Sequence, residues 1–191
     1  MTSSEVFSEA THDDVMLAAT CYKNSPKANR LTQALLKAEK AARAVQIDPQ
    51  ALLGSWQLRF TAPKKPRLQD NQPTSSGFYI PRGLRAEICF LPQQEPTAIA
   101  IQNSLTIGPL RMIFRGNAQP IGKRNVLAFE FTHLQINFAA LTIYQRKLGP
   151  SQLSQASNQR APFFAFFAAH ETYIAARGRG GGIALWVKAR T

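Results

Sequence analysis

The sequence contains little cysteine and no long run of apolar residues. Its two cysteines, Cys21 and Cys89, stand far apart in a chain of 191 residues. This excludes a disulfide-stapled scaffold and a thiolate zinc site, and it favours a reducing compartment. The longest apolar stretch, Ala161 to Ala169, is about half of the roughly 20 residues that a membrane-spanning helix needs. We therefore expect no such helix.

Acidic residues are also scarce. The chain has 23 Lys and Arg against 11 Asp and Glu, which gives a net charge of +12. The first twenty residues are acidic, with a charge of −4, so the remainder carries +16. An acidic start does not match a secretory signal or an organelle transit peptide. The basic remainder predicts an anionic partner, which is a membrane surface, a nucleic acid or an acidic ligand.

The N-terminal part has the pattern of an amphipathic helix. Ser25 and Pro26 suit the N-cap and the first helical position, and the pattern stops before Asp48. The apolar positions recur at steps of three and four: Ala28, Leu31, Leu35, Ala38, Ala42 and Val45. Residues 6–22 are expected to form a weaker helix that packs on it. We predict an N-terminal helical region at residues 1–50.

From Leu52 onward the apolar period changes from about 3.6 to about 2, which indicates strands. Short apolar or alternating runs, separated by Pro and Gly, occur at 56–61, 77–82, 84–91, 98–107, 110–115, 126–132, 134–138, 141–146, 163–169, 173–177 and 183–188. Many short strands without intervening helices predict an antiparallel sandwich or an up-and-down barrel over residues 51–191.

The residue patterns of common catalytic and metal sites are missing. His12, His133 and His170 stand alone, without the spacing of a metal site. The segment from Gly116 to Arg124 only approximates a phosphate-binding loop and is better interpreted as a hairpin turn. We therefore predict a non-enzymatic protein with no metal and no cofactor.

The segment from Arg177 to Gly182 has two interpretations. Arg-Gly segments bind nucleic acids through charge and stacking, but this one lies between two strand-like runs. Glycines at such a place typically form a tight turn. We predict the turn, and we expect nucleic acid not to be the partner.

Phenylalanine is abundant, with 12 residues, which favours burial in hydrocarbon-like surroundings. In the run from Phe163 to Phe167 neighbouring rings alternate between the two faces of a strand. Phe164 and Phe166 share one face, and Phe163 and Phe167 share the other. We predict that Phe163 and Phe167 face a membrane.

Two segments of the sequence form distinctive motifs. Residues 52–61 read LLGSWQLRFT, and Arg177, Gly178 and Gly181 form an Arg-Gly-x-x-Gly pattern that is followed by an alternating apolar strand. The first segment resembles the opening motif of the plastid-lipid-associated protein, or fibrillin, family, and the second resembles the closing turn of that family. The motifs bracket the length that the family's domain requires. The Gly-x-Trp start is also shared with lipocalins.

The resemblance implies a mainly β fold, a lipocalin-like antiparallel β-barrel of about eight strands with an N-terminal helical region. It implies binding or organisation of a hydrophobic small molecule, such as a carotenoid, a prenylquinone or an acyl lipid, without catalysis. It also implies peripheral association with an anionic membrane at thylakoids or plastoglobules. The expected location is the cytoplasm or thylakoid surface of a cyanobacterium, or a plastid if a transit peptide has been removed.

Within such a barrel, we expect Trp56 at the closed end, packed by the N-terminal helix. The candidate ligand-binding residues are Leu58 and Phe60, expected to share a face, with Phe129, Phe131, Phe164 and Phe166. Arg59, Arg115 and Arg177 are candidates for contact with an anionic headgroup.

Two alternatives remain open. A lipocalin-like lyase or chaperone for a linear tetrapyrrole would need Glu87 or Cys89, which share a strand face, to project inward. A basic nucleic-acid-binding module would bind through charge and would lose affinity steeply with salt.

Overall fold

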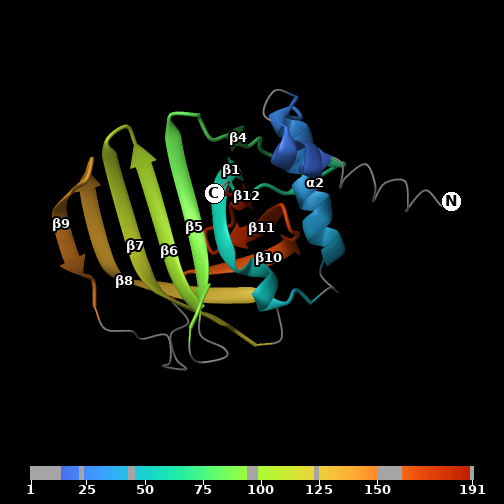
Figure 1. Ribbon diagram of the computed structural model, residues 1–191. Coiled ribbons are helices and arrows are strands. Elements are labelled where there is room, and N and C mark those ends of the chain that lie inside the picture. Colours follow the sequence, from blue (N-terminus) through green and yellow to red (C-terminus); the bar gives the residue numbers. More distant parts are fainter. Residues whose placement is uncertain are drawn as a thin grey trace.

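The computed structural model describes residues 14–21, 24–42, 46–93, 99–122, 125–149 and 161–189. It is mainly β, with two N-terminal α-helices beside a large antiparallel sheet (Figure 1). The strands of this sheet are β1 (Gly54–Ala62), β4 (Phe78–Tyr79), β5 (Leu84–Pro92), β6 (Ile99–Ile107), β7 (Leu110–Pro120), β8 (Val126–Phe138), β9 (Leu141–Lys147), β10 (Phe163–Ala169), β11 (Tyr173–Gly178) and β12 (Ile183–Lys188). A separate two-stranded ribbon comprises β2 (Leu68–Gln69) and β3 (Gln72–Pro73).

The sheet closes on itself through eight strands. The hydrogen-bonded order is β10-β11-β12-β1-β5-β6-β7-β8-β9, and β10 also pairs with β8. This additional pairing forms a ring, a near-barrel, and confirms the predicted antiparallel barrel of about eight strands. The predicted strands at 126–132 and 134–138 are one long strand, β8, which carries a register shift opposite Arg115 and Gly116.

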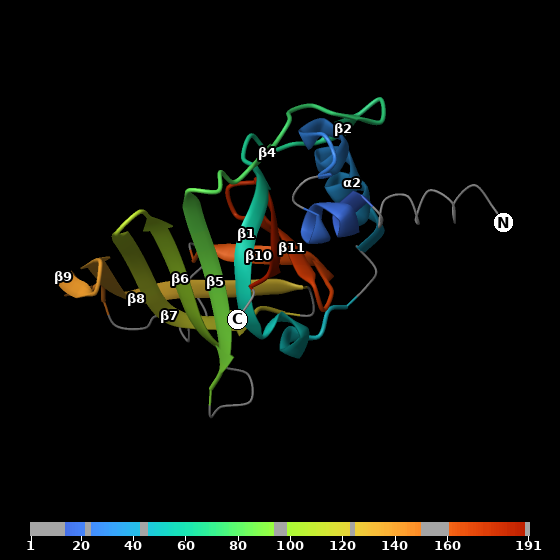
Figure 2. The ribbon, with the colours of Figure 1, turned by 45° about the horizontal axis from the view of Figure 1, so that its top comes forward.

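Part of the sheet lies outside this ring. Near its start β8 pairs with β10, at residues 126–128, and over residues 133–138 it pairs with β9 instead. We call the region outside the ring the wing. It comprises residues 84–86, 103–107, 110–114, 134–138 and 141–147. Figures 1 and 2 show strands β5 to β9 side by side on the left, away from α2 on the right.

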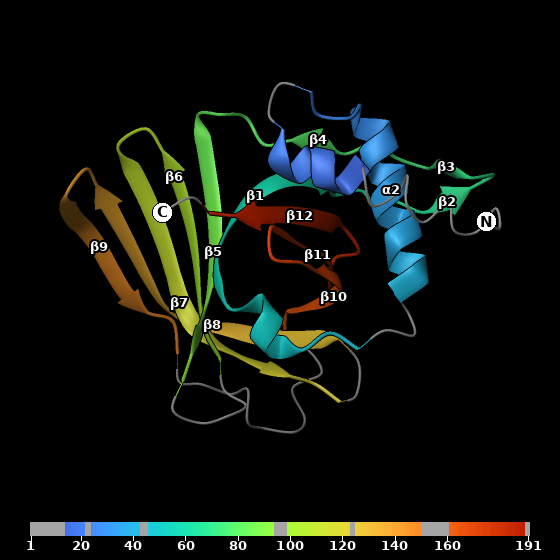
Figure 3. The same cartoon turned by 45° about the vertical axis from the view of Figure 1, so that its right-hand side comes forward.

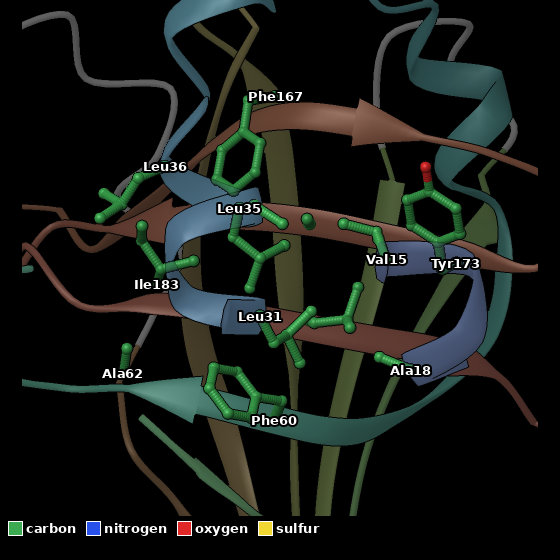
Figure 4. Close-up of a cluster of buried hydrophobic side chains, with 13 residues drawn as sticks. Val15, Ala18, Leu31, Leu35, Leu36, Phe60, Ala62, Phe167, Tyr173 and Ile183 are labelled. Atoms are coloured by element: carbon green, nitrogen blue, oxygen red, sulfur yellow. The ribbon is translucent and has the colours of Figure 1, made fainter. Parts of the chain in front are cut away.

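The two helices cover the outer surface of the ring at β1, β10, β11 and β12. Helix α2 (Ala28–Ala41) places Leu31 and Leu35 against this surface, and the helix at residues 14–20 adds Val15 and Ala18 (Figures 3 and 4). We call the resulting cluster the outer core. Its buried members are Val15, Ala18, Leu31, Ala34, Leu35, Leu36, Phe60, Ala62, Phe167, Tyr173, Ala175, Ile183 and Leu185. Neither helix in the described part of the chain is long and apolar enough to span a membrane.

The start of α2 differs from the prediction. Lys27, and not Ser25, is the N-cap residue, and it makes no side-chain capping bond. The Ser25 hydroxyl instead donates to the Cys21 carbonyl at 2.7 Å and accepts from Arg59 Nη2 at 2.9 Å. These bonds engage Ser25 before the helix begins. Val45 lies outside the described residues.

The inside of the ring forms a second cluster, the inner core. Its buried members are Leu52, Trp56, Ile88, Phe90, Ile99, Ile101, Ala118, Leu127, Phe129, Phe166, Ile174, Ala176 and Trp186. The expected packing of Trp56 on the N-terminal helix is wrong. Trp56 Nε1 donates to the carbonyl of Leu52, at the end of the 3-10 helix η2 (Pro49–Leu52), at 2.7 Å, whereas α2 contributes to the outer core alone.

Candidate apolar binding surface

The wing has one apolar and one polar face, because side chains alternate along each strand. Cross-strand pairing aligns the apolar side chains in rows that run across β5 to β9. The outer row contains Leu84, Ile107, Leu110, Phe138 and Leu141, and the middle row contains Ala86, Leu105, Met112, Ile136 and Tyr144. A third row, at the border with the ring, combines the apolar Phe114 and Leu134 with the polar Asn103 and Arg146, and it ends at Ile88 of the inner core. The apolar face is therefore built from five strands.

This apolar face is not covered by any described part of the chain. In the outer row Ile107 is 53% exposed, Phe138 is 52% exposed and Leu141 is 71% exposed. Tyr144 in the middle row is 44% exposed, and the other middle-row residues are half-buried. Large apolar side chains gathered on one exposed face are typical of a binding surface, whereas single exposed apolar residues are ordinary.

The opposite face of the wing is mainly polar, although the buried Ile113 lies on it between Ser104 and Gln135. One of its rows contains Arg85, Thr106, Arg111, Asn137 and Thr142. Nearer the ring, Arg115 donates from Nε to Gln102 Oε1 at 3.0 Å and from Nη1 to Gln135 Oε1 at 2.8 Å. The wing is thus an amphipathic sheet whose polar face suits water and whose apolar face does not.

The apolar face continues into the inner core through a series of aromatic rings. The centroids of Phe114 and Phe131 are 5.3 Å apart, those of Phe131 and Phe129 5.4 Å, and those of Phe129 and Phe164 4.8 Å. Phe164 lies 5.4 Å from Trp186 in the inner core. A ligand on the wing would therefore contact one end of a surface that is buried at the other end.

A glycine allows this continuity across the register shift of β8. A Cβ atom at Gly116 would lie 1.8 Å from the carbonyl oxygen of Glu130. Only glycine allows β7 to approach β8 this closely. Phe131 and Leu134 consequently remain on the same face, although Thr132 and His133 intervene between them.

The inside of the ring is filled by side chains. Trp56, Phe90, Ile101 and Ile174 are all at most 1% exposed. A cavity of about 60 Å³ lies beside η2, lined in part by Ile47, Leu52 and Phe166. Its volume is far below the roughly 300 Å³ of a small ligand pocket. The described residues therefore offer more room for an apolar ligand on the wing than inside the ring.

Four of the six predicted ligand-binding residues lie together on the inner side. Phe129, Phe131, Phe164 and Phe166 all belong to the inner core or pack against it. The expectation that Leu58 and Phe60 share a face is wrong. A register shift between these two residues directs Leu58 to the inner core and Phe60 to the outer core, beneath α2.

The predicted membrane-facing pair is not an exposed surface. Phe167 is 7% exposed and lies in the outer core, because the two helices fold over this side of β10 (Figure 4). Phe163 is half-buried and pairs with Ala128 of β8. The prediction is wrong for Phe167, and the exposed apolar surface lies on the wing instead.

Two of the three predicted headgroup arginines bind within the protein. Arg59 is 7% exposed and donates from Nε to the Ala18 carbonyl at 3.1 Å. Arg177 donates to both carboxylate oxygens of Glu39 on α2, at 2.5 and 2.6 Å. Both arginines therefore fix the helices to the ring. Arg115 is exposed beside the wing, on the polar side of β7.

The predicted turn after Arg177 is present. Gly178 N donates to the Gly182 carbonyl at 2.9 Å, and Gly181 has a φ of +86°. Arg177 Nη1 also donates to the Gly181 carbonyl, so the arginine stabilises the turn that follows it.

The other chemical candidates do not form a site. Glu87 and Cys89 lie on the polar face, opposite the buried Ile88 and Phe90, so neither projects inward as the tetrapyrrole alternative needs. Cys89 Sγ lies 3.3 Å from Ser55 Oγ. The described residues contain no group of three or more His, Cys, Asp or Glu that could hold a metal ion.

Sequence reasoning missed the wing as a site. The alternation of Leu110, Met112 and Phe114, and that of Leu134, Ile136 and Phe138, correctly predicted strands with one apolar face. The missing information was the strand order, which leaves these faces without cover from the described residues. No model of a known protein family matches the chain, and no curated protein matches it.

Proposed function

We propose that this protein binds a hydrophobic isoprenoid or acyl lipid without catalysis, and that the ligand lies on the apolar face of the wing. The observation that carries this proposal is the middle row, which no described residue covers and which is continuous with the aromatic series from Phe114 to Trp186. The ligand is elongated and largely apolar, because the surface is a strip of aliphatic and aromatic side chains across β5 to β9.

The expected affinity follows from the area that a ligand would cover. Covering one Leu, Ile or Phe side chain contributes about 1.5–3 kcal/mol. Five side chains that are already half-buried would contribute about half of this each, or about 4–8 kcal/mol in total, which corresponds to a millimolar to micromolar complex before the cost of ordering the ligand is subtracted. The middle and third rows offer this number of contacts, in Leu105, Met112, Phe114, Leu134 and Ile136.

Membership in the plastid-lipid-associated protein family is part of the proposal. The two motifs that resemble this family lie side by side in the fold, because residues 54–61 of the first belong to β1, β12 follows the second, and β1 pairs with β12. The location that goes with this proposal is the thylakoid surface of a cyanobacterium, where carotenoids, prenylquinones and acyl lipids are candidate ligands.

Mass spectrometry of an organic extract from the natively purified protein tests the proposal. We expect a carotenoid, quinone or acyl lipid in near-stoichiometric amount from the wild type. The double variant Met112→Ser, Ile136→Ser should lose it, because both changes place hydroxyls in the middle row. Phe78→Ser, which changes an exposed ring on the helix side (52% exposed), should retain the ligand.

Two results would contradict the proposal. One is a folded wild-type protein that carries no apolar molecule and binds none when it is supplied. The other is equal ligand content in the wing variant and in the Phe78→Ser control. A recovered tetrapyrrole would support the alternative function instead.

A further inference from the structure

We infer that the outer end of the wing inserts into the surface of an anionic lipid bilayer. This inference rests on the proposed function in one respect, since the bilayer is then the source from which the apolar ligand reaches the wing. The surface concerned comprises residues 107–110, which join β6 to β7, and residues 138–141, which join β8 to β9. We call these eight residues the wing tip.

The wing tip contains no polar side chain. Its two segments read Ile-Gly-Pro-Leu and Phe-Ala-Ala-Leu, and all eight residues are exposed. Turns between strands in water are normally rich in Asn, Asp, Ser and Gly, because polar side chains satisfy the local backbone. These two neighbouring turns contain one glycine and no Asn, Asp or Ser, which indicates apolar surroundings.

The two turns form one unit. The backbone N–H of Ala139 donates to the carbonyl of Pro109 at 2.7 Å. Leu110 also pairs with Phe138 across β7 and β8. The large side chains of the tip therefore have fixed relative positions, so little conformational entropy is lost when they enter a lipid surface together.

Arginines lie immediately behind the apolar tip. Arg111 follows Leu110 in β7, and Arg85 lies in the same cross-strand row on the polar face. Both are exposed, as is Arg82 in the turn before β5. The Arg85 guanidinium is 3.9 Å from Glu87, a long contact that leaves its side chain 67% exposed. This order, apolar residues first and cations one row behind, suits the acyl and headgroup levels of an anionic bilayer.

The same charges argue against a second copy of the chain as the occupant. Tip-to-tip association would bring Arg85 and Arg111 of one copy toward those of the other, and the chain as a whole carries +12. Anionic headgroups would neutralise these charges, whereas a second copy would not.

Vesicle flotation tests the apolar part of the inference. Wild-type protein should float with vesicles of phosphatidylcholine and phosphatidylglycerol, and much less with phosphatidylcholine alone. The variant Phe138→Ser, Leu141→Ser should bind at least tenfold more weakly. The matched control Leu17→Ser, Phe78→Ser changes two exposed apolar residues on the helix side (43% and 52% exposed) and should bind like the wild type.

A second pair of variants tests the arginines. Arg85→Gln with Arg111→Gln should weaken binding to the anionic vesicles by about fivefold for each arginine. Lys64→Gln with Arg67→Gln removes the same charge from an exposed segment of the helix side and should have a much smaller effect. Equal losses in the two variants would show diffuse attraction to the whole protein and would overturn the inference.

A direct probe gives the orientation. Leu141→Trp should be quenched by brominated anionic lipids, whereas Phe78→Trp should not. The two native tryptophans, Trp56 and Trp186, are buried and set the unquenched background. No difference between the two variants, or a wild type that binds no vesicle, would overturn the inference. So would a tip variant that converts a stable dimer into a monomer, because the tip would then be a self-association surface.

The two proposals fail separately. The tip variants leave the middle row intact, so they should still yield the extracted ligand. If the protein contains the ligand but the tip variants bind vesicles as strongly as the wild type, the bilayer inference alone is overturned. A protein that docks through its tip but contains no apolar ligand would overturn the proposed function alone.

Discussion

Arg177 joins three parts of the molecule at one residue. Its guanidinium binds Glu39 on α2, the Gly181 carbonyl in the turn that follows it, and the Pro66 carbonyl at 3.3 Å. The sequence predicted the turn from its glycines. It could not predict the ion pair, because Glu39 lies 138 residues away and the alternation alone gives Arg177 an ordinary exposed position.

Glu39→Gln should lower the free energy of unfolding by about 1–3 kcal/mol, because the partly buried Arg177 loses its charged acceptor. Urea unfolding measures this change. Lys40→Gln, at the exposed neighbouring position of α2, is the control and should change stability by less than about 0.5 kcal/mol. Equal effects of the two changes would contradict a structural role for the ion pair.

Gly116 is the second residue whose identity the fold requires. Gly116→Ala should destabilise the protein by about 1–3 kcal/mol or more, because the added methyl group would overlap the Glu130 carbonyl. Gly83→Ala serves as the control, since a Cβ there meets no atom within 4 Å. Equal urea midpoints for the two variants would show that β7 and β8 do not approach as closely as described.

At the scale of elements, alternation predicted the strands better than it predicted their faces. Trp56, Leu58 and Phe60 alternate regularly in the sequence, yet the register shift in β1 sends Phe60 to the other side of the sheet. Arg59, at this shift, is buried by its bonds to the helix at residues 14–20. The apolar pattern of a strand does not show a bulge of this kind, because apolar residues suit either side of the sheet when a helix covers one side and the inner core the other.

The helices should contribute strongly to stability through the outer core. Leu35→Ala should lower the free energy of unfolding by about 2–5 kcal/mol, because Leu35 is 1% exposed and its removal leaves a cavity between α2 and the ring. Leu17→Ala, on the exposed side of the neighbouring helix, should cost less than about 0.5 kcal/mol. A small effect of Leu35→Ala in thermal or urea unfolding would contradict the packing of α2 on the sheet.

At the scale of the whole molecule, the charge and the apolar content predict an anionic, apolar partner, but they did not locate the exposed apolar surface. The run from Phe163 to Phe167 contains the highest local density of rings in the sequence, so it was the natural candidate for a membrane surface. Its outer side is covered by the two helices, whereas Leu110, Phe138 and Leu141, less conspicuous in the sequence, are exposed. Strand order decides between these outcomes, and short apolar runs do not encode strand order.

The same sheet has one part that stabilises the fold and another part, the wing, that exposes apolar side chains. Within the ring, the apolar face forms the filled inner core and supplies stability. Beyond the ring, the same face continues across β5 to β9 without cover from the described residues, and there we propose that the ligand binds. The aromatic contacts from Trp186 through Phe129 to Phe114 connect the two regions.

Photo-crosslinking tests the binding face most directly. A long-chain fatty acid that carries a diazirine on its alkyl chain would be bound to the purified protein, irradiated and located by peptide mass spectrometry. We expect labelled residues within 103–114 and 134–147, and a sharp loss of labelling in the variant Met112→Ser, Ile136→Ser. Labelling confined to the helices and the outer surface of the ring, or a signal that these two changes leave untouched, would contradict the account.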